Sequence, residues 1–186
     1  KDIIRAYRIP ILEVAGYEAD DVIGTLATEA GRQGITTYMM TPDKDYGQLV
    51  SDRIFMYRPK HTGGFEVMGT EEVKAKFNIQ TTEQVIDMLG LMGDASDNIP
   101  GCPGVGEKTA QKLIAEFGSI ENLLEHTDQL KGALKTKVET NREMITFSKF
   151  LATIKTDVPI QLDMDSLVRE AVSYTHLRAH ETTLHL

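Results

Sequence analysis

The stretch formed by residues 93–110 combines residue types that bind metal ions with residue types that bind phosphate. Asp94 and Asp97 are separated by two residues, and carboxylates at that spacing can share a hard cation such as Mg2+. Gly104 and Gly106 follow, where glycine lets backbone N–H groups approach a phosphate closely and the start of a following helix adds its positive end. A metal site beside a phosphate site indicates chemistry on nucleic acids.

Two further groups of acids occur earlier in the chain. Glu18, Asp20 and Asp21 open a segment, residues 18–32, whose apolar residues recur at helical spacing, which predicts a helix. Asp43 and Asp45 follow residues 35–41, which are rich in β-branched and aromatic residues and predict a buried strand. Ligands in open α/β sheets bind beyond the carboxyl ends of strands, so this second pair is placed where a ligand would be expected.

Each acidic group also has a simpler interpretation. Acids in the first turn of a helix interact with its dipole, and Asp in a turn hydrogen-bonds its own backbone. Convergence of the three groups would favour a functional role, because clustered carboxylates repel one another unless cations lie between them. An oxygen-only ligand set selects Mg2+ or Mn2+ rather than zinc, and a pair of such ions can hydrolyse phosphodiesters.

The rest of the pattern predicts a β-hairpin followed by helices. Strands are expected at residues 53–57 and 65–68. Helices are expected at 70–77, from a capping box formed by Thr81 and Gln84 through Met92, and at 107–117, 119–124 and 131–149. Lys108, Thr109 and Lys112 follow the glycine hairpin and would contact a phosphate backbone without reading bases, although a plain turn between helices is the alternative. The basic residues of 131–149 offer a second backbone contact or an ordinary solvated face.

Composition fits a soluble, intracellular globular chain of 186 residues. No apolar run is long enough to span a membrane, no signal peptide is present, and Cys102 is the only cysteine, which excludes an internal disulfide. The formal net charge of −8 argues at first against a nucleic-acid partner, but setting the seven clustered acids aside leaves −1. Metal ions at those acids would neutralise much of the excess.

The last residues differ in character from the rest of the chain. Residues 173–186 hold three of the five histidines, His176, His180 and His185, without other support for a metal site. The letters SYTHLRAHET resemble translated sequencing-adapter sequence. Residues 171–186 are therefore expected to be a non-native tail and are excluded from the fold.

Three segments together resemble the 5′-nuclease (flap endonuclease-like) family, and above all the 5′→3′ exonuclease domains of bacterial DNA polymerase I. They read GYEADDVIGTLA (16–27), TPDKDYGQLV (41–50) and LMGDASDNIPGCPGVGEKTA (91–110). The resemblance implies an α/β fold with a central, mostly parallel, PIN-like sheet and flanking helices in residues 1–78. It also implies an all-helical region in residues 79–170 that carries a helix-three-turn-helix motif.

The resemblance also implies roles for individual residues. Glu18, Asp20 and Asp43 would lie near a first divalent metal and Asp45, Asp94 and Asp97 around a second, with Asp21 in the same catalytic cluster. The hairpin would hold duplex DNA and could bind K+ through backbone carbonyls. Its implied DNA-binding residues are Gly101, Gly104, Val105, Gly106, Lys108, Thr109 and Lys112. The implied substrate is duplex DNA with a 5′ end or flap, hydrolysed during replication and repair in the bacterial cytoplasm by a domain continuous with a polymerase.

One departure from the family pattern is clear. The family's first strand with its metal-binding Asp, a second such Asp and the helical arch have no counterpart in this sequence. The chain is therefore expected to be a fragment that exposes an apolar sheet edge, binds metal weakly and cleaves DNA poorly. A non-catalytic duplex-DNA-binding module is the main alternative. A Mg2+-dependent phosphatase would explain the acids but not the hairpin.

Overall fold

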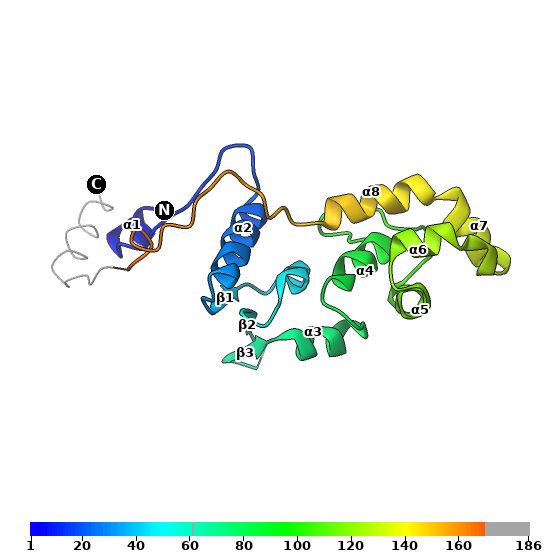
Figure 1. Cartoon of the computed structure of the whole chain (residues 1–186), viewed down its shortest axis with the longest axis horizontal. Helices are drawn as coiled ribbons and strands as arrows, with labels where there is room; N and C mark the ends of the chain where they lie inside the picture. The colour runs from blue at the N-terminus through cyan, green and yellow to red at the C-terminus, as the bar shows by residue number, and fades with distance from the viewer. Residues whose placement is uncertain (61, 170–186) are drawn as a thin grey trace.

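A computed structural model describes residues 1–60 and 62–169 of the chain, so the predicted tail and its histidines lie outside the described residues. Figure 1 shows a sheet-containing half and a helical half side by side. The elements are α1 (Asp2–Ala6), α2 (Ala19–Arg32), β1 (Thr37–Met40), the 3-10 helix η1 (Lys44–Leu49), β2 (Ile54–Pro59), β3 (Phe65–Met68), α3 (Thr70–Phe77), α4 (Gln84–Met92), α5 (Glu107–Phe117), α6 (Ile120–Glu125), the 3-10 helix η2 (Thr127–Gln129), α7 (Gly132–Thr140) and α8 (Arg142–Ala152).

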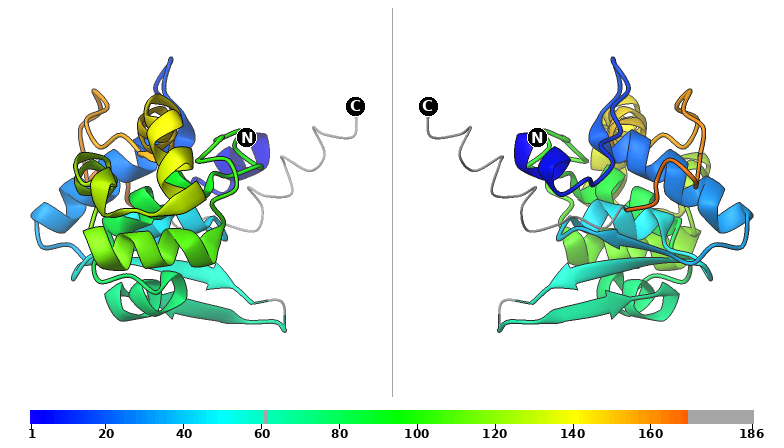
Figure 2. Two further views of the ribbon diagram at one scale, coloured as in Figure 1. Left: turned by 90° about the vertical axis from the view of Figure 1, so that its right-hand side faces the viewer. Right: turned by 90° about the vertical axis from the view of Figure 1, so that its left-hand side faces the viewer.

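The described strands form one small mixed sheet in the order β1-β2-β3. β1 runs parallel to β2, with Thr37 opposite Ile54, and β2 pairs antiparallel with β3, with Met56 opposite Met68. The α/β class and the β2–β3 hairpin predicted from the sequence are confirmed, although β1 is shorter than the predicted 35–41. Figure 2 shows this hairpin projecting beyond the helices in both views.

The inner face of the sheet forms the first of two hydrophobic cores. Each strand contributes one buried methionine to this face: Met39 from β1, Met56 from β2 and Met68 from β3. Their neighbours along each strand point to the opposite face, because side chains alternate between the two faces of a sheet. The core is closed by Val73 and Phe77 of α3 and by residues of α2, η1 and α4. This packing fixes η1, and therefore Asp45, beyond the carboxyl end of β1.

A second core joins the helices from α4 to α8. Leu113, Ile114 and Phe117 of α5 recur at helical spacing and are buried there. The single helix predicted over residues 131–149 is wrong, because the chain breaks at Asn141 into α7 and α8. Lys149 was assigned from the sequence to a basic face. Its Nζ instead lies 2.6 Å from Oδ1 of Asp87, and this ion pair joins α8 to α4.

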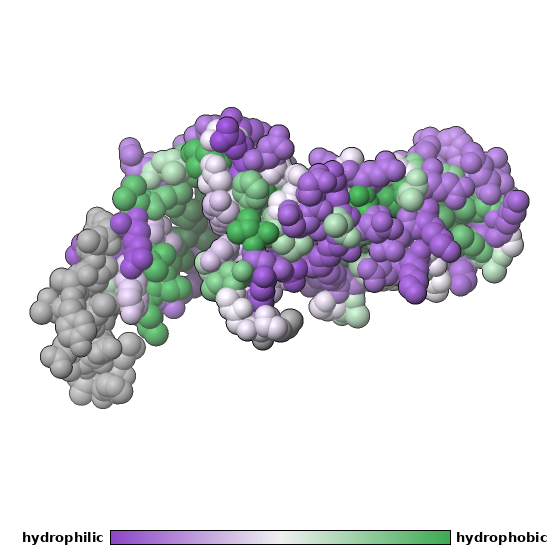
Figure 3. Space-filling model, turned by 90° about the horizontal axis from the view of Figure 1, so that it is seen from below, coloured by the Kyte–Doolittle hydropathy of each residue, from purple (hydrophilic) through white to green (hydrophobic). Residues whose placement is uncertain are grey.

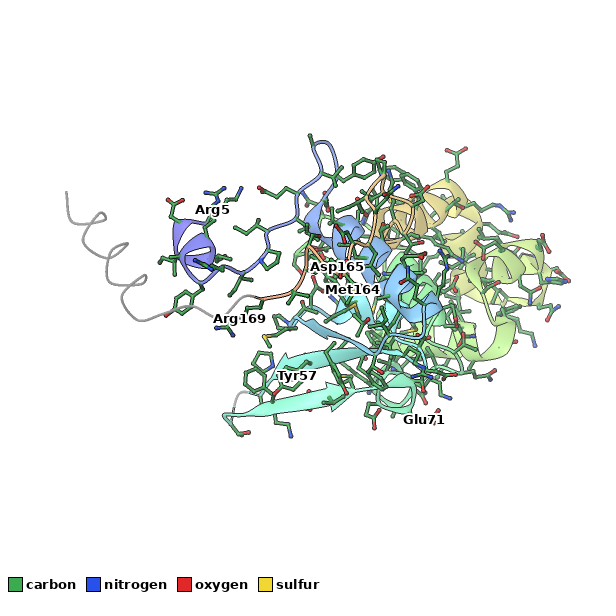
Figure 4. All side chains as sticks on the ribbon, turned by 60° about the vertical axis from the view of Figure 1, so that its left-hand side comes forward. Arg5, Tyr57, Glu71, Met164, Asp165 and Arg169 are labelled. Carbon is green, nitrogen blue, oxygen red and sulfur yellow. The ribbon has the colours of Figure 1, made fainter. Side chains whose placement is uncertain are left out.

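The outer face of the sheet is apolar and exposed. Tyr38 is 57% and Met40 72% exposed on β1, and Phe65 is 50% exposed on β3. Phe65 stacks on Tyr57 with ring centroids 4.6 Å apart, and Figure 4 labels Tyr57 beside the hairpin. Figure 3 shows hydrophobic residues breaking the hydrophilic surface in the half of the molecule that holds the sheet. The apolar exposure expected from the sequence is present among the described residues.

Replacing Met40 by lysine is expected to reduce self-association of the chain. A large exposed apolar patch on an edge strand promotes association, and a charge on that strand opposes it. Size-exclusion chromatography with light scattering should show wild-type mass rising with concentration and the Met40→Lys variant remaining closer to a monomer. Met164→Lys makes the same change at a residue 46% exposed outside the sheet and should behave as wild type. Equal association by all three proteins would contradict this prediction.

Candidate metal centre and nucleic-acid interface

η1 places Asp43 and Asp45 at the carboxyl end of β1. Asp43 caps the helix by accepting a hydrogen bond from the Asp45 backbone N–H at 3.0 Å, so the turn role considered for it is real. Gln48 fixes the other side of η1, donating from Nε2 to the carbonyl of Ala152 at 2.9 Å and accepting from the N–H of Ile154. Asp45 is only 8% exposed as a result.

A tight loop after α4 orients Asp94. Its backbone pairs with Ile99 through hydrogen bonds of 2.9 and 2.8 Å, and the Ser96 N–H donates to Oδ1 of Asp94 at 2.8 Å. Gly93 has a φ of +72°, and an added Cβ there would lie 2.6 Å from the carbonyl oxygen of Ile99. The loop can therefore hold this conformation only with glycine at that position.

The two loops bring three of the predicted acids together. Asp45, Asp94 and Asp97 each offer one carboxylate oxygen within 4.8 Å of the others. At such a separation two like charges repel by about 3–4 kcal/mol at an effective dielectric constant of 20. Oδ1 of Asp45 is buried and has no hydrogen-bond partner among the described residues. An orphaned oxygen in an all-carboxylate group fits a hard divalent cation.

The carboxylates of this group have divergent pKa values. Burial, followed by repulsion from Asp43, raises the pKa of Asp45 to about 6. Burial would also raise the pKa of Asp94, but hydrogen bonds from Lys44 and Ser96 outweigh it and lower that pKa to about 2. Burial and the charges of Asp94 and Asp43 raise the pKa of Asp97. Of these three carboxylates, Asp45 is thus the one whose charged form burial disfavours most.

The remaining acids lie nearby with other partners. Asp20 accepts a hydrogen bond of 2.7 Å from the Tyr46 hydroxyl, while Asp21 accepts one of 2.9 Å from the Lys155 N–H and forms a capping box with Glu18. Asp21 therefore anchors the segment that follows α8. A cleft of about 250 Å³ is lined by Glu18, Asp20, Asp21, Asp45, Asp97, Ile99, Leu151, Ala152, Thr153 and Ile154. The three acidic groups predicted from the sequence are thus neighbours; their metal-binding and catalytic roles stay predictions.

Two residues of the site were not anticipated from the sequence. Lys44 forms ion pairs with Asp94 and Asp45, and Tyr46 holds Asp20. Burial would lower the pKa of Lys44, but the surrounding acids outweigh it and raise that pKa. A lysine between two Asp residues was a signal that sequence reasoning passed over.

The glycine hairpin divides into buried and exposed residues. Gly101 is buried, has a φ of +64° and donates its N–H to Ser148 Oγ at 2.9 Å. Val105 is 3% exposed and packs in the helical core. The side chain of Val105 therefore faces the protein, and Gly101, which has no side chain, is itself covered, so neither residue presents an exposed surface in this structure. Gly104, Gly106, Lys108 and Lys112 are exposed and Thr109 is partly exposed.

Two family models together match nearly the whole chain. The 5′-3′ exonuclease N-terminal resolvase-like domain matches residues 1–78, and the 5′-3′ exonuclease C-terminal SAM fold matches residues 80–175. The chain belongs to the 5′-3′ exonuclease family. Curated relatives include DNA polymerase I of Bacillus caldotenax, 44% identical, and that of Bacillus subtilis, 46% identical. Each match covers 90% of this chain and 19% of the relative, so the chain spans about a fifth of their length.

Solved structures agree with this family's fold. A T5 5′-exonuclease with bound zinc ions superposes with a TM-score of 0.71 at 21% identity, over 94% of this chain and 61% of that chain. The catalytic core of Rad2 in complex with DNA gives a TM-score of 0.64 at 16% identity, over 98% of this chain and 60% of that chain. At these identities the likeness establishes the fold alone. No helix within residues 1–60 and 62–169 is long and apolar enough to cross a membrane.

In the absence of metal ions, the stability of the chain should fall as the pH rises from about 4 to 6. Asp45 has a folded-state pKa of about 6 against an ordinary 3.8, so the folded state binds its proton more tightly and is favoured only while that proton is bound. The loss is at most about 3 kcal/mol. Asp94 affects stability in the opposite direction, because its pKa is lowered in the folded state. The stability that it contributes is fully present above its ordinary pKa of 3.8 and is lost as the pH falls toward 2.

Urea unfolding in EDTA at pH 4 to 7 measures this effect. Subtracting the curve of the Asp45→Asn variant removes the contribution of groups that do not interact with Asp45, and the difference should show wild type losing stability through pH 4 to 6. Parallel pH profiles for the two proteins would contradict the pKa that burial and Asp43 impose on Asp45.

Proposed function

We propose that this chain is the metal-dependent 5′→3′ exonuclease and 5′-flap endonuclease part of a bacterial DNA polymerase I. The observation that carries the proposal is the meeting of Asp45, in η1, with Asp94 and Asp97, whose loop after α4 continues directly into the glycine hairpin. The proposed metal centre and the proposed phosphate-binding turn would thus be only a few residues apart in the chain. One T5 structural neighbour is in complex with DNA and metal ions and another has divalent zinc ions bound, which supports the same classes of ligand for this chain.

The acids would hold two divalent ions, Mg2+ or Mn2+. Asp45, Asp94 and Asp97 are the proposed ligands of one ion, and Glu18, Asp20 and Asp43 of the other. When bound, the ions supply the positive charge that activates water and stabilises the leaving oxygen of a phosphodiester. Asp45 is buried, and its Oδ1 accepts no hydrogen bond from the described residues, although the Lys44 ammonium lies 3.7 Å away.

The hairpin would hold the duplex by its phosphate backbone. The proposed contacts are the exposed backbone of Gly104 and Gly106 and the side chains of Lys108, Thr109 and Lys112 at the start of α5. None of these groups reads a base edge, so recognition would follow DNA structure rather than sequence. A K+ ion bound by hairpin carbonyls is also part of the proposal. In this structure the Gly104 carbonyl accepts a hydrogen bond of 3.4 Å from the ammonium of Lys137, so a positive charge already lies beside that carbonyl.

The bacterial polymerase relatives support two wider parts of the proposal. The chain would work within a longer protein that carries a polymerase domain, in replication and repair in the cytoplasm. Residues 1–78 would form the α/β part of the nuclease and residues 79–170 its helical part.

Single-turnover hydrolysis of a 5′-flap duplex, with enzyme in excess, tests the proposal. The chain should cleave the flap in Mg2+ and stop cleaving in EDTA, at a low rate that single-turnover conditions still detect. Duplex binding without metal-dependent cleavage would favour the alternative, a non-catalytic DNA-binding module.

Replacing Lys108 and Lys112 by alanine should weaken duplex binding equally for different sequences. Each lost phosphate contact removes about one unit from the slope of log affinity against log salt concentration. Fluorescence anisotropy over a salt series measures that slope, which should fall by up to about two for the double variant. Lys74→Ala with Lys76→Ala removes the same charge from α3, in the sheet-containing half of the molecule, and an equal loss there would contradict a specific hairpin contact.

A further inference from the structure

The ammonium group of Lys44 lies inside the carboxylate group described above. Its Nζ forms a hydrogen-bonded ion pair with Oδ2 of Asp94 and lies 3.7 Å from Oδ1 of Asp45. The Lys44 side chain is 33% exposed, and its charged end contacts the acids. Two of the three carboxylates therefore share a positive charge that the chain itself provides.

A divalent ion on the same carboxylates would need the same oxygens. Oδ1 of Asp45 has no hydrogen-bond partner among the described residues, and the longer ion pair with Lys44 leaves it incompletely compensated. The Lys44 ammonium donates a hydrogen bond to Oδ2 of Asp94, so one of the two carboxylate oxygens of Asp94 already has a cationic partner. An ammonium ion and a divalent ion repel each other, so they cannot occupy this space together. The flexible stem of lysine lets the ammonium move into solvent.

We propose that Lys44 is an internal counter-ion that competes with the divalent cation for the site. It neutralises part of the carboxylate charge in the metal-free protein and lowers the affinity of the site for metal. The inference rests on the proposed metal centre and assigns to this chain's own lysine the control of its occupancy. Removing the ammonium should therefore strengthen metal binding and weaken the metal-free fold.

Mn2+ titration of the full chain tests the competition, with free Mn2+ measured by electron paramagnetic resonance. Lys44→Met, which keeps the stem and removes the charge, should bind Mn2+ at least about tenfold more tightly than wild type. Lys44→Arg keeps a competing charge and should stay within about threefold of wild type. Lys135→Met changes the net charge equally in α7 and should leave the affinity unchanged. Equal or weaker binding by Lys44→Met would overturn the proposal.

Thermal unfolding in EDTA provides a readout that needs no metal. Lys44→Met should melt below wild type, because three clustered carboxylates lose their counter-charge. Adding Asp94→Asn to that variant should raise the melting temperature again, since it removes the carboxylate left without a partner. Should Lys44→Met fail to fold in EDTA, Mn2+ should restore its fold. Wild-type melting in EDTA, or failure to fold even with Mn2+, would contradict the counter-ion role.

The two proposals fail in different ways. If wild type and Lys44→Met bind no more Mn2+ than Asp94→Asn does, the metal centre itself is wrong and the competition is wrong with it. If Asp94→Asn loses Mn2+ binding while Lys44→Met gains none, the metal centre stands and only the role of Lys44 is refuted.

Discussion

Replacing Gly101 by alanine is expected to unfold much of the helical half of the protein. The backbone of Gly101 has a φ of +64°, and an added Cβ would lie 2.4 Å from the amide nitrogen of Gly93. Both partners are backbone, so no side chain can move aside. The strain of a positive φ costs about 1–3 kcal/mol by itself, and the clash adds to it. A total above about 4 kcal/mol approaches the whole stability of many domains.

Urea unfolding followed by circular dichroism measures that loss. Gly106→Ala is the matched control: Gly106 has no positive φ, and an added Cβ there would meet no atom within 4 Å. As the residue that caps α5, Gly106 should cost at most about 1 kcal/mol on replacement. A Gly101→Ala variant as stable as Gly106→Ala would show that the hairpin does not pack against Gly93 as described.

Gly101→Ala should also reduce metal binding, because Gly93 is the residue before Asp94. A shift of Gly93 moves the loop in which Asp94 pairs with Ile99. The loss of metal binding should accompany the loss of stability.

Asp94→Asn should lower the rate of flap cleavage by at least about 100-fold. The substitution keeps the size of the side chain and an oxygen for the Ser96 N–H, so the loop should remain folded. It removes the negative charge that a divalent ion requires, and the ion contributes several kcal/mol of transition-state stabilisation, where each 1.4 kcal/mol is a factor of ten. The single-turnover flap assay in Mg2+ measures the rate.

Asp128→Asn makes the same chemical change in η2, where the side chain is exposed. It should cleave at the wild-type rate. A rate for Asp94→Asn within threefold of this control would exclude Asp94 as a metal ligand needed for cleavage.

The sequence allowed the fold class and most elements to be predicted because local signals agreed with the final packing. Helix α5 has the predicted limits, and Ser119 caps α6 through the Asn122 N–H at 3.2 Å. The break between α7 and α8 was missed because residues 131–149 keep a helical pattern through Asn141. The contact of Lys149 with Asp87 was missed as well, since the two residues are 62 positions apart and only the tertiary fold brings them together.

The candidate site was predictable in its acids and less so in their surroundings. Carboxylates at strand and helix ends have few structural reasons to cluster, so Asp45, Asp94 and Asp97 could be identified by type and spacing. Gly101 and Val105 were assigned to DNA contact from the family resemblance alone, and the spacing of a glycine turn does not show which of its residues are buried. Their burial follows from packing against Gly93 and the helical core.

Anomalous diffraction from crystals of this chain grown with Mn2+ tests the central claim most directly. The claim is that Asp45, Asp94 and Asp97 form a divalent-metal site. The predicted result is an anomalous peak among the three carboxylates, about 2–2.5 Å from their nearest oxygens. A map with no peak at these carboxylates under saturating Mn2+ would contradict the claim.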